Sequence, residues 1–217
     1  MNVTEIVPTV LTNDPEQYKM LIAKFQPFAK RIQVDIADGT FAPAVTIPVN
    51  NVWWPQGWTV DLHMMVARPS EHMPILLQLK PSLVIFHAET GEDLLPLFDQ
   101  LKNAGIKAGV ALMKPTFPGS VRPFIEKADH VLVFAGEIGK QGSQADMLQT
   151  EKIQLIKDIN PNAEIGWDGG ANLRTVRAIS RAGADVIDVG SALTGAEDPS
   201  AMFEALTSDL DKRGVVL

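Results

Sequence analysis

The sequence predicts a (β/α)₈ TIM barrel, a ring of eight parallel strands surrounded by helices. Short apolar segments rich in Val, Ile and Leu recur at fairly even spacing, and each is followed by a polar, amphipathic segment. The apolar segments alternate only partly with polar residues, as is typical of parallel strands covered on both faces. No linker interrupts the pattern, so residues 1–217 are expected to form a single barrel domain. The expected strands are 5–11, 31–37, 59–66, 82–89, 107–113, 130–136, 163–170 and 185–193.

Three of the intervening segments have the spacing of amphipathic helices. Segment 91–105 ends at Gly105, and segment 150–160 begins at Thr150, whose hydroxyl is expected to cap the helix. Segment 172–185 is expected to begin a helix at Asn172 and to end it at Gly183. The positions expected to face inward are Leu94, Leu97 and Leu101 in the first helix and Ile153, Ile156 and Ile159 in the second.

The connection after the second strand departs from this pattern. Residues 49–58 are few and aromatic, so the second helix is expected to be a single turn or to be missing. Trp53, Trp54 and Trp58 are expected either to form an interface or to cap the bottom of the barrel in place of that helix.

Composition excludes several classes of function. A net charge of −7 without a basic cluster argues against a nucleic-acid surface, although a small phosphorylated ligand needs only a few backbone N–H groups. The absence of cysteine excludes disulfides, thiolate catalysis and cysteine-based metal sites. No segment approaches the roughly 20 apolar residues of a membrane helix, and the N-terminus lacks the features of a signal peptide. We therefore expect a cytoplasmic protein without a membrane or nucleic-acid partner.

Polar residues fall at the ends of the expected strands, where barrels of this kind carry their chemistry. Asp35 comes late in the second strand, His63 late in the third, and Asp168 ends the seventh; His87 and Glu89 end the fourth. Each has a purely structural alternative: an ion pair for Asp35, a helix cap for Asp168, a satisfied core position for His63. Together, two aspartates and a histidine on one rim favour an active site. Outside this set, Asp38 is expected to form a turn with Gly39, and His72 and His130 to be structural.

Glycines follow the last three strands. Gly139 and Gly142 come after the sixth, Gly169 and Gly170 after the seventh, and Gly190 with Ser191 after the eighth. Loops in these places often present backbone N–H groups to a phosphate, and glycine permits a close approach. The last two loops favour a phosphate site, whereas Gly139 and Gly142 alone are equally compatible with ordinary turns.

In the order and spacing of its motifs, the chain resembles the ribulose-phosphate 3-epimerase family over nearly its whole length. The stretches that carry the resemblance are IVPTVLTND (6–14), VDIADGTFAP (34–43), DLHMMVARP (61–69), FHAET (86–90), GVALMKPT (109–116), WDGGANLRTVRAISRAGADV (167–186) and VGSALTGAEDP (189–199).

This resemblance implies a (β/α)₈ barrel of the ribulose-phosphate-binding type that acts on a pentulose 5-phosphate. It implies that Asp35 and Asp168 exchange a proton at C3 and that His63 binds a divalent metal together with them, the metal holding the ene-diolate oxygens. Homo-oligomers are usual in the family. The residues expected to contact the substrate are Thr9, His63, Met65, Gly142, Gly169, Gly170, Gly190 and Ser191.

The chain departs from the family pattern near the metal. The family opens its second strand with His-Val-Asp, whose histidine is a metal ligand, and this chain has Gln33-Val34-Asp35. An amide oxygen is a weak, neutral ligand that suits Zn²⁺ or Fe²⁺ poorly and Mg²⁺ or Mn²⁺ better. Ala37 and Phe134 replace family methionines, which leaves Met65, and residues 138–142 read IGKQG in place of Pro-Gly-Phe-Gly-Gly.

Three functions follow from these observations. The first is a metal-assisted epimerase for ribulose 5-phosphate and xylulose 5-phosphate. The second is an epimerase, isomerase or aldol-type enzyme for another ketose phosphate, with or without a metal. The third is a sugar-phosphate-binding relative that has lost catalysis, which the changes at Gln33 and in 138–142 would explain.

Overall fold

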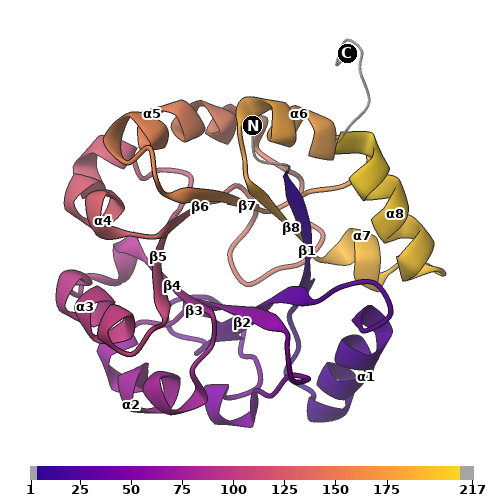
Figure 1. Cartoon of the computed structure of the whole chain (residues 1–217), viewed down its shortest axis with the longest axis horizontal. Coiled ribbons are helices and arrows are strands. Elements are labelled where there is room, and N and C mark those ends of the chain that lie inside the picture. The colour runs from indigo at the N-terminus through magenta and orange to yellow at the C-terminus, as the bar shows by residue number, and fades with distance from the viewer. Residues whose placement is uncertain (1–3, 211–217) are drawn as a thin grey trace.

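The computed structural model describes residues 4–210; the first three and the last seven residues of the predicted domain lie outside the described part. Eight parallel strands form a closed barrel in sequence order, with β8 paired to β1 (Figure 1). The predicted (β/α)₈ fold is confirmed. The strands are β1 (Glu5–Val10), β2 (Arg31–Ala37), β3 (Thr59–Met65), β4 (Leu83–His87), β5 (Lys107–Leu112), β6 (His130–Phe134), β7 (Glu164–Asp168) and β8 (Val186–Val189).

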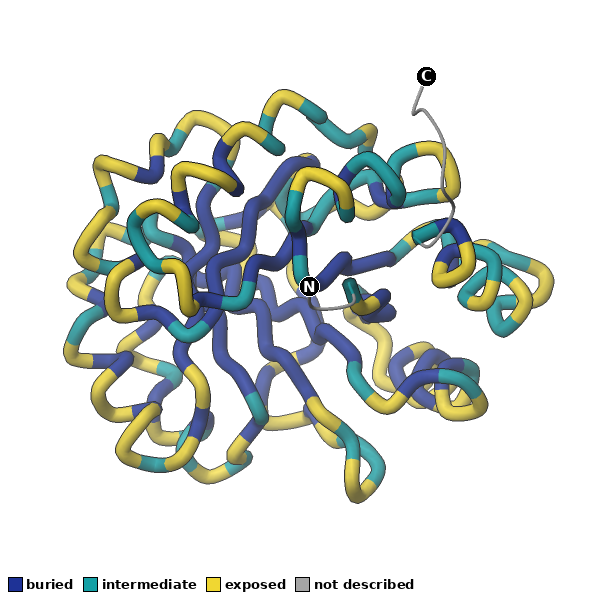
Figure 2. The backbone as a smooth tube through the Cα atoms, turned by 45° about the horizontal axis from the view of Figure 1, so that its top comes forward, coloured by how far each residue is buried: buried dark blue, intermediate teal, exposed yellow. Residues whose placement is uncertain are grey.

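Helices surround the strands, whose residues are mostly buried, while exposed residues lie on the outer ring (Figures 1 and 2). No helix of residues 4–210 is both long enough and apolar enough to cross a membrane. The α-helices are α1 (Pro15–Phe25), α2 (Pro69–Leu79), α3 (Leu95–Asn103), α4 (Arg122–Lys127), α5 (Glu151–Ile159), α6 (Val176–Ala182), α7 (Ser191–Thr194) and α8 (Pro199–Leu210). Short 3₁₀ helices are η1 (Val49–Asn51), η2 (Ala88–Thr90), η3 (Pro118–Val121) and η4 (Met147–Thr150).

Alternation along the strands separates two cores. On β2, Ile32, Val34 and Ile36 belong to the large cluster shared with the helices, so Gln33 and Asp35 between them face the barrel interior. A smaller apolar cluster from β4, β5 and β6 fills the opposite wall of the interior, and it consists of Leu83, Ile85, Ala111 and Leu132. The interior is therefore apolar on one side and polar on the other.

One expected helix lacks its predicted cap, and another begins later than predicted. The Thr150 hydroxyl does not cap α5: the backbone there is already helical at the end of η4, and the hydroxyl donates to the Met147 carbonyl at 2.7 Å. Asn172 begins a turn, with its Oδ1 accepting from the Arg174 N–H at 2.8 Å, and α6 starts at Val176. Gly183 ends α6 with a φ of 106°, as predicted.

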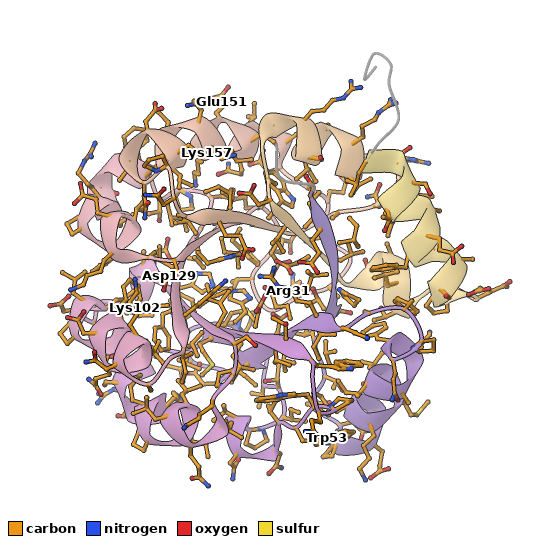
Figure 3. All side chains as sticks on the ribbon, viewed as in Figure 1. Arg31, Trp53, Lys102, Asp129, Glu151 and Lys157 are labelled. Carbon is orange, nitrogen blue, oxygen red and sulfur yellow. The ribbon has the colours of Figure 1, made fainter. Side chains whose placement is uncertain are left out.

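The only helical element in the connection after β2 is the single turn η1, which confirms that the second helix is shortened. Trp53 lies at the periphery, outside the ring of strands (Figure 3). Its ring meets Tyr18 of α1 edge-on at 5.9 Å, and the Tyr18 hydroxyl donates to the Trp53 carbonyl at 2.7 Å. Trp54 and Trp58 pack against the outer core, and an interface at this segment stays a prediction.

A charged network fills the N-terminal end of the interior, where Arg31 lies inside the ring of strands (Figure 3). Its guanidinium contacts Asp61 at 2.8 Å, Glu164 at 2.7 Å and Glu5 at 2.9 Å, and His130 Nδ1 lies 2.9 Å from Glu164 Oε2. Burial would raise the pKa of Glu164, but the hydrogen bonds from His130 and Arg31 prevail and hold this pKa far below its usual value. His130 is therefore part of a structural network, as predicted.

This network predicts an acid-dependent contribution to stability. Because the pKa of Glu164 is depressed in the folded state, its stabilising effect is present above the unfolded value of 4.5 and is lost as pH falls below it. Glu164→Gln should lower the free energy of unfolding at neutral pH by about 1.5–3 kcal/mol. The difference from the parent should shrink in acid, as measured by denaturant unfolding across pH. Glu5→Gln, which alters a half-exposed partner of the same arginine, should cost less. A difference that does not change with pH would contradict this assignment.

Candidate active site

A pocket opens at the C-terminal ends of the strands. Nearly all of the predicted site residues line it, from six of the eight strand ends or the loops that follow them. His63 and Gln33 do not line the pocket, because both are buried behind it. The predicted residues that do line the pocket are Thr9, Asp35, Met65, Gly142, Asp168, Gly169, Gly170, Gly190 and Ser191.

Asp35, His63 and Asp168 converge at the floor of the pocket. Pairing of β2 with β3 sets Asp35 beside His63, whose Nδ1 lies 3.0 Å from Asp35 Oδ1 and 3.5 Å from Asp168 Oδ2. One ligand atom from each residue lies within 4.8 Å of the others, so the group can hold a metal ion. A direct contact of His63 with the substrate stays a prediction, since the two carboxylates stand between its ring and the pocket.

Gln33 joins the two carboxylates. Its Nε2 donates to Asp35 Oδ1 at 3.1 Å and to Asp168 Oδ2 at 2.9 Å, so the amide reaches from β2 to β7. Its Oε1 is buried, and no described residue donates a hydrogen bond to it. The amide therefore holds together two groups that would otherwise repel each other.

The protonation of this cluster reflects its burial. Burial, and then the charge of Asp35, raise the pKa of Asp168 to about 6, while His63 and Gln33 act in the opposite direction. Burial would lower the pKa of His63, but the hydrogen bond and charge of Asp35 prevail and raise it. Asp168 thus retains its proton at higher pH than an isolated aspartate would.

Asp188 is a third carboxyl group in the pocket, and it is not among the site residues predicted from the sequence. It lies on β8 beside Asp168, and its buried Oδ1 has no hydrogen-bond partner among the described residues. Burial, and then the charge of Asp168, raise the pKa of Asp188 well above its usual value. The sequence contained a signal for Asp188. It stands two residues before the predicted site residue Gly190, and residues two apart along a strand face the same side.

Glycines bring three loops together around the pocket. Gly169 and Gly170 have φ values of 115° and 69°. A Cβ on Gly169 would overlap the backbone of Gly136, and one on Gly170 would overlap the backbone of Ala145. The loop after β6 therefore packs directly on the loop after β7, which only glycine allows. Ser191, at the start of α7, lies beside Gly142 of the same β6 loop.

Asp38 organises the turn after β2, as predicted. Its Oδ1 accepts from the N–H groups of Thr40 and Phe41 at 2.8 and 2.9 Å, and its Oδ2 accepts from the Ala67 N–H at 2.7 Å. This turn brings the Phe41 ring to 4.9 Å from the ring of His87, behind the pocket.

The fold and the site define a (β/α)₈-barrel protein with paired carboxylates beside a glycine-lined pocket. The model of the ribulose-phosphate 3-epimerase family matches residues 5–194, and the chain belongs to this family. Ribulose-phosphate 3-epimerase of Schizosaccharomyces pombe is 28% identical over 96% of this chain and 94% of its own. The same enzyme of Aquifex aeolicus is 27% identical over 94% and 95%.

Solved structures support the fold. The structure of 3-hexulose-6-phosphate synthase from Salmonella typhimurium superposes with a TM-score of 0.73 at 18% identity, covering 95% of this chain and 98% of the other. Orotidine 5′-phosphate decarboxylase from Pyrococcus horikoshii superposes with a TM-score of 0.68 at 18% identity, covering 96% and 100%. Family membership confirms the predicted resemblance and the prediction of a sugar-phosphate epimerase.

The coupling of the two carboxylates can be tested directly. Asp35→Asn removes the charge that helps to raise the pKa of Asp168, so this pKa should fall from about 6. Carboxyl ¹³C NMR of the metal-free protein across pH would measure it. Asp14→Asn, at an exposed helix cap, should leave it unchanged. If the pKa of Asp168 is the same in the Asp35→Asn variant, the two groups do not interact as described.

Proposed function

We propose that this protein interconverts D-ribulose 5-phosphate and D-xylulose 5-phosphate by moving a proton at C3. The observation that carries the proposal is the pair Asp35 and Asp168, two carboxylates from different strands whose oxygens lie within 4.8 Å of each other beside the pocket. Curated relatives that match almost the full chain carry the name of this activity.

The chemistry requires a base and an acid. A proton next to a carbonyl group is weakly acidic, and inversion at the carbon requires one group on each face of the substrate. We assign these roles to Asp35 and Asp168, each acting as base in one direction and as acid in the other. The pKa of Asp168 near 6 supports this role, because a carboxyl group with a pKa close to the working pH both accepts and donates a proton readily.

The phosphate would occupy the glycine-lined end of the pocket. Gly169, Gly170, Gly190 and Ser191 line the pocket, and glycine lets backbone N–H groups approach an anion closely. Thr9 and Met65 also line the pocket and would contact the carbon chain.

The residues present fit a hard divalent cation. Asp35, His63 and Asp168 would hold it, and Gln33 would become a fourth ligand if its amide turned so that the unpartnered Oε1 faced the carboxylates. Three of the four ligands would then be oxygen, which favours Mg²⁺ or Mn²⁺ over Zn²⁺ or Fe²⁺. When bound, such a cation would stabilise the negative charge that develops on the substrate oxygens.

Purified protein should therefore convert ribulose 5-phosphate to xylulose 5-phosphate, with higher activity in Mg²⁺ or Mn²⁺ than in Zn²⁺ or Fe²⁺. In deuterated water, deuterium should appear at C3, as measured by NMR. Asp168→Asn should lose both turnover and exchange by at least about 10²-fold, because one of the two proton-transferring groups is gone.

The alternatives give different results in the same assay. Exchange at a carbon of another ketose phosphate, without turnover of ribulose 5-phosphate, would mean that the substrate is different. Thermal stabilisation by these sugars without turnover or exchange, against an active control epimerase, would mean a binding protein that has lost catalysis. Cytoplasmic localisation and homo-oligomeric assembly stay predictions.

Gln33→His tests the metal site. An imidazole in this place should raise the affinity for Zn²⁺ relative to Mg²⁺, because borderline-soft metals prefer nitrogen ligands. Isothermal titration calorimetry and elemental analysis of the untagged protein would measure the change. Gln154→His, which adds a histidine on the exposed side of α5, is the matched control. An unchanged preference between the two metals would exclude Gln33 from the metal site.

A further inference from the structure

We propose that Glu89 is a positioning residue that acts through His87 to fix the proton on Nε2 of His63 and so leaves Nδ1 as the ligand atom. The proposal deepens the proposed function, since it concerns how the metal-binding histidine is prepared.

A chain of side-chain contacts leads from the pocket to the loop after β4. His63 Nδ1 faces Asp35 at 3.0 Å, and His63 Nε2 lies 2.8 Å from His87 Nε2. On the far side of the second ring, His87 Nδ1 lies 3.3 Å from Glu89 Oε2. The order is therefore Asp35, His63, His87 and Glu89, from β2, β3, β4 and η2.

The 2.8 Å contact between two imidazole nitrogens requires one of them to carry a proton and the other to have a free lone pair. Glu89 determines which. An ionised carboxylate only accepts hydrogen bonds, so the His87 nitrogen that faces it must carry the proton. A neutral His87 then has a lone pair on Nε2, and the proton between the two rings must belong to His63 Nε2. The hydrogen bond between the two rings therefore runs from His63 Nε2 to His87 Nε2, whether or not His63 Nδ1 carries a proton.

Glu89 is held in its ionised form. Burial would raise its pKa, but hydrogen bonds from His87, Thr116 and the Met113 N–H prevail and lower it. Its two oxygens have separate partners: Oε2 faces His87, whereas Oε1 accepts from the Thr116 hydroxyl and from the Met113 N–H. The two contacts can therefore be altered separately.

The two imidazole rings are shielded from bulk solvent. His63 and His87 are both fully buried. Phe134 lies 5.9 Å from the His63 ring and 5.8 Å from the His87 ring, and Phe41 lies 4.9 Å from His87. With aromatic rings around them, the two histidines depend for their hydrogen bonds on each other, on Asp35 at one end of the chain and on Glu89 at the other.

The consequence concerns metal binding. A histidine binds a metal through a nitrogen with a free lone pair, and the hydrogen bond made by its other nitrogen sets which one that is. In this protein the nitrogen on the pocket side is Nδ1, and the chain from Glu89 keeps the proton on the opposite side. Without Glu89, His87 could donate from Nε2 to His63, which would move the His63 proton to the side of the carboxylates.

The direct test is the tautomer of His87 in metal-free protein. Long-range ¹H–¹⁵N NMR should show the parent His87 protonated on Nδ1 and unprotonated on Nε2. In Glu89→Leu, the other tautomer should appear or the two should mix. Glu89→Gln keeps an acceptor oxygen and should restore most of the parental state. Thr116→Val removes a partner of Oε1 only and should leave the tautomer unchanged, which separates positioning from anchoring of the loop.

Titration with Mn²⁺ gives the second readout. Loss of such a supporting hydrogen bond typically weakens metal binding by about 10–100-fold, so Glu89→Leu should show a loss of this size and Thr116→Val should not. If the His87 tautomer is the same in the parent and in Glu89→Leu, the proposal is wrong, whatever the activity. If the tautomer shifts while the parent neither binds Mn²⁺ nor turns over substrate, the positioning role holds and the proposed function fails.

Discussion

The structure depends most on holding two carboxylates close together at the edge of a buried interior. Asp35 and Asp168 stand at the ends of β2 and β7, and each would be expensive to bury alone. Three features offset that cost: the donors of Gln33, the ring of His63 and the opening to the pocket. Burial and the nearby charge of Asp35 raise the pKa of Asp168. The arrangement that is costly to bury therefore also prepares Asp168 for proton transfer.

The barrel interior separates two kinds of charge cluster. At the N-terminal end, carboxylates meet Arg31, a permanent cation with several donors, and hydrogen bonds from this cation and from His130 keep Glu164 ionised. At the C-terminal end, the partners are an amide and histidines, which leave carboxyl groups able to take up protons or to bind a cation. This difference in partners, rather than the number of acidic groups, distinguishes the structural end from the chemical end.

The barrel and much of the site could be predicted from the sequence because the two signals that indicate them are local. Apolar segments at even spacing predict the barrel, and the position of a polar residue at a strand end predicts its place on the rim, as for Asp35, His63 and Asp168. Contacts between distant strands carry no local signal. The hydrogen bond from Gln33 to Asp168 joins residues 135 positions apart. Because of it, Gln33 is not only the residue that replaces a metal-binding histidine but also a hydrogen-bond donor within the site. The predicted cap at Thr150 was wrong although a local signal was present. Thr150 has a suitable residue type, but the turn of η4 precedes it, so its backbone is already helical.

Gln33 is best understood by comparing what an amide and an imidazole can do between two carboxylates. A neutral imidazole has one N–H group, whereas the amide nitrogen donates to both carboxylates at once. While the imidazole is neutral, exchanging one for the other leaves the charge of the cluster unchanged and alters only the hydrogen bonds and the ligand type. The amide therefore stabilises the metal-free arrangement more than a neutral imidazole would, and it offers a harder, weaker ligand to a cation. A site built in this way should release its metal more readily while keeping its two carboxylates in place.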